Sequence, residues 1–286
     1  MSLVDLADRA AAADGVAPLN EASLFALRDR VRARVLVQQA DADGRTVAGA
    51  YAAGDAPVEI VVDPDRRRQG VGLRILDELL ADGEDAFWAH GDLPAARALA
   101  SSAGLVAGRT LLALRLTFDG APTPERVPDG VTLRTFEADD VDAVVAVNAR
   151  AFAHHPEQGA MDRADMERRM ASDWFDAEGF FVAERDGRVV GFHWTKVEDS
   201  IGEVYVVGID PDAQGGGLGT ALTARGLRHL HERGLEVVDL YVEGDNAAAL
   251  TVYRNLGFAD HARDTLYVRP PAAPDPHTHT HPHTHP

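Results

Sequence analysis

Two glycine-rich segments carry the residue types and spacing of a phosphate-binding loop. Arg67-Arg-Gln-Gly-Val-Gly72 and Gln214-Gly-Gly-Gly-Leu-Gly219 each follow an apolar run that ends in Asp-Pro, and each precedes a helical pattern. Glycines let the backbone approach a ligand closely, and N–H groups at the positive end of a helix attract an anion. The pattern suits a pyrophosphate, and a Gly-rich turn without a ligand is the alternative for either copy alone. The sequence contains neither a Gly-Lys-Ser/Thr loop nor a dinucleotide fingerprint.

The two segments belong to a repeat that runs through most of the chain. Asp63 and Asp210 are 147 positions apart, and the same offset relates Gly70 to Gly217. Each loop is followed by a leucine-rich helical pattern, a short strand, a second helix that ends in Gly, and a β-rich run. Matching elements at one offset indicate a tandem duplication of one α/β unit.

Upstream of each loop, the sequence predicts helices followed by a β-hairpin. Asp43-Gly44 and Asp186-Gly187 separate apolar runs, which is the strongest short-range hairpin signal. The predicted order is strand, helices, three antiparallel strands, helix, strand, helix and strand, an α/β fold class with a mixed sheet and helices on both faces. We expect domains at 1–118 and 131–269, a Pro- and Gly-rich linker at 119–130, and a disordered His/Pro/Thr tail at 270–286.

The composition limits the classes of function. The chain has 286 residues, with 46 Asp and Glu against 28 Lys and Arg, and a formal net charge of −18. Nucleic acids and anionic membranes require a basic patch, so neither is expected as a partner. The absence of Cys excludes a disulfide scaffold, a thiolate-bound metal and a Cys nucleophile. With no apolar span and no export signal, we expect a cytoplasmic protein, and we expect it to be a monomer.

In both halves the chain resembles the GCN5-related N-acetyltransferase (GNAT) family. There the Arg/Gln-x-x-Gly-x-Gly/Ala loop holds the pyrophosphate of acetyl-CoA, and Asn246-Ala-Ala-Ala-Leu-Thr-Val-Tyr253 is similar to the family's second signature. The resemblance implies two tandem GNAT domains, acetyl-CoA as cosubstrate with a site in each domain, and no metal. In the second half the implied acetyl-CoA residues are Val207, Gly208, Ile209, Gln214, Gly215, Gly216, Gly217, Leu218, Gly219, Thr220, Asn246, Ala247, Ala248, Ala249, Leu250 and Thr251. In the first half they are Ile60, Val61, Val62, Arg67, Arg68, Gln69, Gly70, Val71, Gly72 and Leu73.

Five longer stretches are similar to one tandem-domain subgroup of that family. They begin at Phe87, Ala151, Gly191, Gly202 and Leu240 and lie in both halves. Members of the subgroup acetylate the cysteinyl amine of a cysteinyl-glucosaminyl-inositol pseudodisaccharide, the last step of mycothiol biosynthesis in actinobacteria. The alternatives are a GNAT enzyme for another small amine and a non-catalytic acyl-CoA-binding module.

Acetyl transfer to an amine needs a base for the ammonium and an acid for the departing CoA thiolate. The resemblance implies that Glu203, on the predicted strand entering the second loop, is the general base. It implies that Tyr253, on the helix after Asn246, is the general acid, since a phenol with a pKa near ~10 can protonate a thiolate. The alternatives are a surface strand residue for Glu203 and an ordinary packed aromatic for Tyr253.

The first half has neither group at the matching positions. Ala56 stands where Glu203 is expected, and Ala100 stands where Tyr253 is expected. Glu59 is out of register by three residues, an odd number, so we expect its side chain on the opposite face of the strand. The sequence therefore predicts that the second domain is the catalyst. The first domain would bind acetyl-CoA without turnover or support the structure.

The resemblance also implies a set of substrate-binding residues: Glu21, Glu157, Lys196, Glu203 and Tyr241. Lys196 is the one Lys in a chain with 27 Arg, which indicates that a compact ammonium is needed there. Structural alternatives are a helix-start role for Glu21, a core position for Tyr241 and a surface position for Lys196. Glu157 has the alternative of lying with His154 and His155 in a solvated loop. His193 and Trp194 are expected to be sheet residues.

The second loop departs from the family pattern because it has no Arg. We therefore expect it to bind acetyl-CoA more weakly than the first loop does, with Arg225 or Arg254 as candidates to supply charge. The tract His277-Thr-His-Thr-His-Pro-His-Thr-His-Pro286 does not have the spacing of a folded metal site, and we expect no role for it in catalysis.

Overall fold

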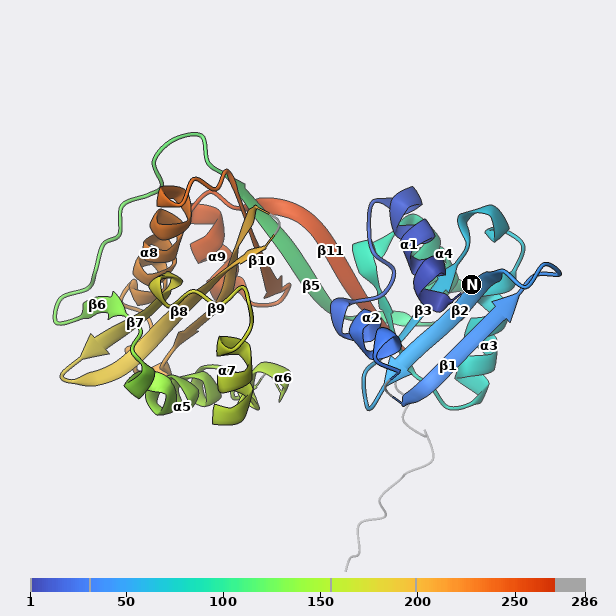
Figure 1. Cartoon of the computed structure of the whole chain (residues 1–286), viewed down its shortest axis with the longest axis horizontal. Helices are drawn as coiled ribbons and strands as arrows, with labels where there is room; N and C mark the ends of the chain where they lie inside the picture. The colour runs from blue at the N-terminus through green and yellow to red at the C-terminus, as the bar shows by residue number, and fades with distance from the viewer. Residues whose placement is uncertain (1, 31, 155, 199, 271–286) are drawn as a thin grey trace, which may run out of the picture. The chain divides into compact units, whose positions relative to one another are not determined.

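The computed structural model describes residues 2–30, 32–154, 156–198 and 200–270, without the side chains of residues 21, 156 and 157. The predicted His-rich tail lies outside this range. The chain forms two compact units, one from the described residues up to Thr110 with those from Asp264 on, and one from Leu111–Arg263. In each unit helices pack on both faces of a sheet (Figure 1). Within the described residues, no helix is long and apolar enough to span a membrane.

The first unit begins with two helices and continues with antiparallel strands. Its helices are α1 (Leu3–Asp14), α2 (Glu21–Arg28), α3 (Val71–Ala81) and α4 (Pro94–Ser102). Its strands are β1 (Ala33–Ala40), β2 (Thr46–Ala53), β3 (Val58–Val62), β4 (Ala86–Ala89) and the start of β5 (Val106–Thr117). The pairs β1–β2 and β2–β3 are antiparallel, whereas β3–β4 is parallel. Residues 265–268 of β11 (Ala259–Val268) pair antiparallel with β4.

The second unit follows the predicted order in full. Its helices are α5 (Val141–Ala151), α6 (Pro156–Gly159), α7 (Arg163–Met170), α8 (Leu218–Glu232) and α9 (Ala247–Asn255). Its strands are β6 (Thr132–Thr135), β7 (Phe180–Arg185), β8 (Arg188–Glu198), β9 (Ile201–Ile209) and β10 (Val237–Glu243). The order is β6-β7-β8-β9-β10, with β9–β10 parallel, and residues 111–117 of β5 pair antiparallel with β10.

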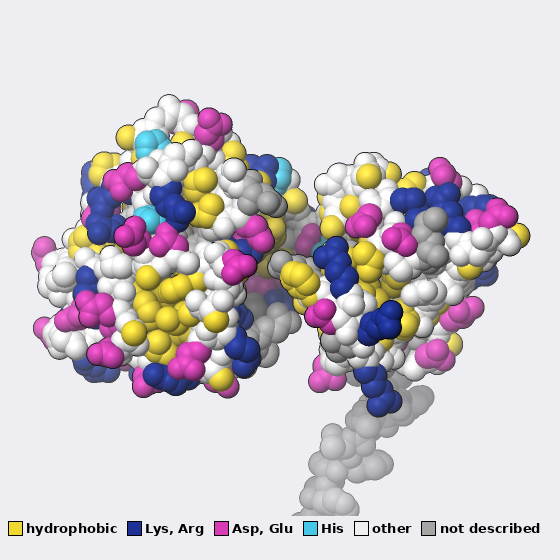
Figure 2. All heavy atoms as spheres, in the orientation of Figure 1, with side chains coloured by type: hydrophobic (Ala, Val, Ile, Leu, Met, Phe, Trp, Pro, Cys, Tyr) yellow, Lys and Arg dark blue, Asp and Glu magenta, His cyan; other side chains and the backbone are white. Residues whose placement is uncertain are grey.

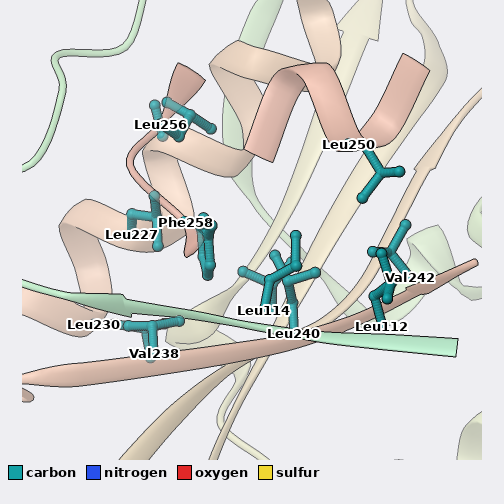
Figure 3. Close-up of a cluster of buried hydrophobic side chains, with 12 residues drawn as sticks. Leu112, Leu114, Leu227, Leu230, Val238, Leu240, Val242, Leu250, Leu256 and Phe258 are labelled. Atoms are coloured by element: carbon teal, nitrogen blue, oxygen red, sulfur yellow. The ribbon is translucent and has the colours of Figure 1, made fainter. Parts of the chain in front are cut away.

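The core of the second unit follows from strand alternation. Val238, Leu240 and Val242 point to one face of β10 and pack with Leu227 of α8 and Leu250 of α9 (Figure 3). The intervening Asp239 and Tyr241 therefore point to the other face. Asp239 and Tyr241 therefore lie on the face of the sheet opposite the apolar cluster under α8 and α9.

The closing strands explain why the compact units differ from the expected domains. The predicted linker 119–130 lies inside the second unit, because β5 pairs with β10 before the linker begins. The end of β11 in turn belongs to the first unit. In the first unit, the described residues have no strand before α1, whereas β6 precedes α5 in the second. Basic and acidic side chains are interspersed over the face visible in Figure 2.

Candidate functional site

A row of charged side chains crosses the face of the sheet opposite α8 and α9 in the second unit. Glu203 of β9 stands opposite Lys196 of β8 in the antiparallel register and opposite Asp239 of β10 in the parallel register. Asp239 in turn stands opposite Arg115 of β5. Residues opposite each other on neighbouring strands share a face, so these four side chains lie in one row.

Tyr241 lies on the same face, two positions beyond Asp239, and its side chain is 59% exposed. Three of the five predicted substrate residues, Lys196, Glu203 and Tyr241, therefore come together on neighbouring strands. The side chains of the other two, Glu21 and Glu157, lie outside the described residues, as does His155.

The partners of this row distinguish its two carboxylates. Arg115 donates two hydrogen bonds to Asp239, at 2.7 and 2.6 Å, and this contact raises the pKa of Arg115. Lys196 Nζ lies 2.7 Å from a carboxylate oxygen of Glu198 and 5.4 Å from the centre of the Trp174 ring. Asp239 is thus committed to a bidentate guanidinium, whereas Glu203 stands beside a compact ammonium. Sequence reasoning missed Asp239 and Arg115, since neither belongs to a recognisable motif.

The parallel strands β9 and β10 separate immediately after Glu203. Their register contains two pairs, Gly202 with Val238 and Glu203 with Asp239, although β9 continues to Ile209 and β10 to Glu243. The backbone groups beyond this point do not pair between the two strands. An extended ligand can lie in such a split and reach Glu203 from the side of α8 and α9.

Tyr253 lies on the α8 and α9 side of this split. It is carried by α9 and packs against the apolar cluster of Figure 3, with its ring centre 5.9 Å from that of Phe258. Burial raises the pKa of Tyr253 to about 12. The phenol therefore stays protonated through the neutral range, as a proton donor must.

The glycine-rich loop before α8 has the backbone of an anion site. Gly215 and Gly217 have φ of 84° and 82°, in the left-handed region that favours glycine. Within the described residues, no N–H from Gly215 to Thr220 donates a hydrogen bond to a protein acceptor. These groups converge at the N-terminus of α8, where the helix dipole also favours negative charge. Asn246 accepts a hydrogen bond from the N–H of Ala249 and so caps the N-terminus of α9.

The basic residues expected to supply charge to this loop already have partners. Arg225 lies 3.3 Å from Glu125, and Arg254 lies 3.2 Å from Asp260. Arg150 bridges Asp210 and Asp212 at 3.0 and 2.7 Å. Backbone N–H groups are thus the principal donors that the second loop offers to a phosphate.

The loop of the first unit has the same backbone and opens into a cavity. Arg68 and Gly70 have φ of 63° and 74°, matching Gly215 and Gly217 at the offset of 147. Arg67 donates two hydrogen bonds of 2.7 Å to Asp14, so its guanidinium is engaged within the protein. A cavity of about 560 Å³ begins at this loop and continues between α3, α4, β3 and β4. Its lining includes most residues predicted for acetyl-CoA in this half: Ile60, Val61, Val62, Arg67, Arg68, Gly70, Val71, Gly72 and Leu73.

The prediction that Glu59 points to the opposite face from Glu203 is wrong. Val58 packs in the core with Ile75 of α3, so its neighbour Glu59 points toward α1 and α2. There the N–H of Asn20 donates to Glu59 Oε1 at 2.8 Å. This is the face equivalent to that of Glu203, since α1 packs on β2 and β3 as α5 packs on β8 and β9.

The cause of this error is a β-bulge at Tyr205. Trp194 pairs with Val206 and Thr195 with Val204, which leaves Tyr205 as an extra residue in β9. The extra residue reverses the alternation, so positions three apart share a face. A count of residues along the sequence does not include this bulge.

Glu59 belongs to a buried network in the first unit. His90 Nε2 lies 2.6 Å from Glu59 Oε1, and His90 Nδ1 lies 2.9 Å from Asp264. Burial alone would lower the pKa of His90, but the hydrogen bonds and charges of Asp264 and Glu59 raise it to about 9. A carboxylate that is 1% exposed and bound to an imidazolium is not placed to accept a proton from an incoming amine.

His193 and Trp194 are core residues of the sheet, as predicted. Both are 0% exposed, and His193 Nδ1 lies 2.8 Å from the carbonyl oxygen of Leu222. Burial lowers the pKa of His193 to about 4. Among the described residues, no group of three or more His, Asp or Glu side chains is arranged to hold a metal ion.

Comparison with known proteins identifies the family. Residues 148–258 match the model of the Acetyltransferase (GNAT) family. A mycothiol acetyltransferase from Kytococcus sedentarius is 50% identical over 275 residues, which cover 93% of this chain and 92% of that protein. The chain belongs to the mycothiol acetyltransferase family. The resemblance drawn from the sequence is thereby confirmed, as is the expectation of an acetyltransferase enzyme.

Solved structures confirm the fold expected for a mycothiol acetyltransferase with two GNAT domains. A GCN5-related N-acetyltransferase from Sphaerobacter thermophilus has a TM-score of 0.73 at 23% identity, covering 92% of this chain and 90% of that one. A tandem GNAT protein from the clavulanic acid biosynthesis pathway has a TM-score of 0.61 at 19% identity, covering 94% of each chain.

Proposed function

We propose that the second unit transfers an acetyl group from acetyl-CoA to the cysteinyl amine of 1D-myo-inositol 2-(L-cysteinylamino)-2-deoxy-α-D-glucopyranoside, the last step of mycothiol biosynthesis. The observation that carries the proposal is the row of Lys196, Glu203 and Asp239 at the mouth of the β9–β10 split. In the proposal, an amine acceptor meets a thioester lying in the split beside this carboxylate and this ammonium. The names of the family's members supply the substrate class.

In this proposal the glycine-rich loop holds the pyrophosphate of acetyl-CoA, which supplies the activated acetyl group. Glu203 removes a proton from the substrate ammonium, directly or through a water molecule. The amine nitrogen then bonds to the thioester carbonyl carbon, the carbon–sulfur bond breaks, and the nitrogen releases its second proton to solvent, from which the Tyr253 oxygen regains a proton after each turnover. Tyr253 donates its proton to the departing thiolate. Because burial raises the pKa of Tyr253 to about 12, the phenol retains this proton until that step.

The remaining predicted residues have supporting roles in the proposal. Lys196 and Tyr241 bind the acceptor from the same face as Glu203, and Glu21 and Glu157 are proposed as further substrate-binding residues. Residues 207–209 and 246–251 hold the pantetheine and acetyl parts of acetyl-CoA. We also propose a cytoplasmic monomer with no nucleic acid or membrane partner, in keeping with the net charge of −18.

The first unit is proposed to bind acetyl-CoA without turnover. Its loop and cavity are suited to the cosubstrate, but Glu59 is engaged by His90 and Asn20, and Ala100 replaces the phenol. We propose that the duplicated sequence domains are 1–118 and 131–269, joined by 119–130. The compact units differ from these in the placement of their closing strands and in including 119–130 within the second unit.

The test mixes the full chain with acetyl-CoA and the cysteinyl pseudodisaccharide and follows the release of free CoA thiol. Turnover with this acceptor and much slower turnover with glucosamine, cysteine or an aminoglycoside is the expected result. Turnover with another amine alone would favour a different GNAT acceptor. Binding of acetyl-CoA without thiol release from any amine would indicate a non-catalytic acyl-CoA-binding module.

A further inference from the structure

The cavity of the first unit extends to a place where the second unit carries two aromatic rings. The N–H of Leu105 donates to the carbonyl of Ala100 at 3.0 Å, as the N–H of Phe258 donates to that of Tyr253 at 3.1 Å. These matching turns make Ala100 the structural equivalent of Tyr253, and Leu105 that of Phe258. In the second unit the two rings pack against each other and fill the space between α9 and the sheet.

In the first unit this space is part of the cavity. Ala100 and Leu105 line it, together with Leu76 of α3, Phe87 of β4 and Tyr267 of β11. The first four are at most 7% exposed, so the cavity reaches the core of the unit. The cavity also runs without interruption to Arg68 and Gly70 of the phosphate loop.

The side chains that line the inner end of the cavity are mostly apolar. The phenol of Tyr267 donates a hydrogen bond of 2.8 Å to Asp92, so it is engaged away from a ligand. Leu76, Leu99, Phe87 and Leu105 supply hydrocarbon surface around the space left by Ala100. An unbranched alkyl chain would gain burial there without leaving a polar group unpaired.

The position of this space relates it to the sulfur of a bound thioester. In the proposed function Tyr253 protonates the CoA thiolate, so its ring end lies close to the sulfur. The equivalent place in the first unit, next to Ala100, is then open beside the acyl end of a bound CoA thioester. We propose that the first unit is a binding site for acyl-CoA thioesters whose linear acyl chain is longer than acetyl, of about four to six carbons. The inference rests on the proposed function in one respect, the binding of a CoA thioester by the first unit.

The test titrates the full chain with acetyl-CoA, butyryl-CoA and hexanoyl-CoA by calorimetry. One of two sites is expected to bind butyryl-CoA more tightly than acetyl-CoA, by about fourfold for each added methylene. The other site, where Tyr253 and Phe258 fill the space, is expected to show no such gain. Equal or weaker binding of the longer thioesters at both sites would overturn the inference.

Two substitutions assign the effect to the cavity. Ala100→Tyr restores the ring of the second unit and is expected to remove the gain with chain length while acetyl-CoA still binds. The matched control is Ser101→Tyr, which places the same ring on the exposed side of α4. If Ala100→Tyr lowers the melting temperature of the chain, Leu105→Phe serves in its place, because it adds fewer atoms to the cavity. It is expected to weaken hexanoyl-CoA binding. A chain-length gain that persists in both filled variants would place the alkyl site elsewhere.

The same titration separates this inference from the proposed function. If acetyl-CoA and CoA bind at one site alone in the unsubstituted chain, the first unit does not hold a CoA thioester and the proposed function fails in that respect. If both sites bind acetyl-CoA and neither favours a longer chain, only the inference about acyl length fails.

Discussion

Lys196 and Glu203 face each other directly across the antiparallel pair β8–β9, at the last position before β9 separates from β10. The single ammonium side chain of the sequence thus stands next to the carboxylate proposed as general base. This relationship places a predicted substrate-binding residue directly opposite the predicted general base.

Replacing Glu203 with Gln is expected to lower kcat by about 100-fold or more, because the amide keeps the shape of the side chain but cannot accept the proton. Steady-state rates of CoA thiol release measure the loss. The matched control is Glu59→Gln in the first unit, which removes a carboxylate that His90 and Asn20 engage. Similar losses in kcat for the two variants would contradict the assignment of catalysis to the second unit.

Replacing Lys196 with Arg is expected to raise KM for the acceptor amine about tenfold. The side chain of Lys196 is 11% exposed and lies between Glu198 and the Trp174 ring, a space that suits a compact ammonium better than a planar guanidinium. A loss of about 1.4 kcal/mol in binding corresponds to that factor. The reverse exchange Arg188→Lys, at the exposed start of the same strand, serves as the control and should leave KM unchanged. If Lys196→Arg has the same KM as the wild type, the position does not require an ammonium.

Replacing Tyr253 with Phe is expected to lower kcat by about tenfold to 100-fold, since the thiolate would then take its proton from water. Because burial raises the pKa of Tyr253 to about 12, ionisation of this phenol should not reduce the rate below about pH 11. The pH dependence of kcat measures this, and the basic limb of wild type should be the same as that of Tyr253→Phe. A basic limb near pH 9 that disappears in the variant would argue against the raised pKa.

The fold was predictable because its signals are local. The two Asp-Gly hairpins and the two glycine-rich loops each depend on residues close together in sequence, and the structure has elements at all of them. The repeat is recognised because these local patterns recur at an offset of 147 residues. The left-handed backbone at residues 68 and 70 recurs at 215 and 217. Three of these four residues are glycine, and the fourth is Arg68.

The parts that failed depend on pairing between distant segments. The bulge at Tyr205 is visible only in the register of β9 against β8, and it reverses the face assigned to Glu59. The Asp239–Arg115 pair joins residues 124 positions apart, and the His90–Asp264 contact joins residues 174 apart. No pattern within either segment identifies such a partner.

Two buried histidines should make stability depend on pH in opposite directions. The folded pKa of His193, about 4, lies below its ordinary value of 6.5, so the unfolded chain binds the extra proton and stability falls as pH drops from about 6.5 toward 4. The folded pKa of His90, about 9, lies above 6.5, so its contribution is complete below pH 6.5 and is lost as pH rises through 9. When the folded and unfolded pKa of a group differ by one, the free energy of unfolding changes by about 1.4 kcal/mol across that range.

Urea unfolding between pH 4 and pH 10 measures both effects. His193→Phe is expected to flatten the acid side of the stability profile, and His90→Gln is expected to flatten the alkaline side. An acid limb that is unchanged in His193→Phe would mean that carboxylates alone cause it.

The glycine-rich loop before α8 lacks Arg, so its backbone conformation should determine how well it binds acetyl-CoA. Gly217 has φ of 82°, and an L side chain there is strained by about 1–2 kcal/mol, so Gly217→Ala should displace the N–H groups that precede α8. We expect KM for acetyl-CoA to rise about fivefold to 30-fold with a smaller change in KM for the acceptor. Gly216→Ala is the matched control, because Gly216 does not have a positive φ and a Cβ there meets no atom within 4 Å. Since backbone N–H groups are the principal phosphate donors of this loop, its conformation should matter more than its side chains. Equal values of KM in the two variants would indicate that the pyrophosphate is held by other groups.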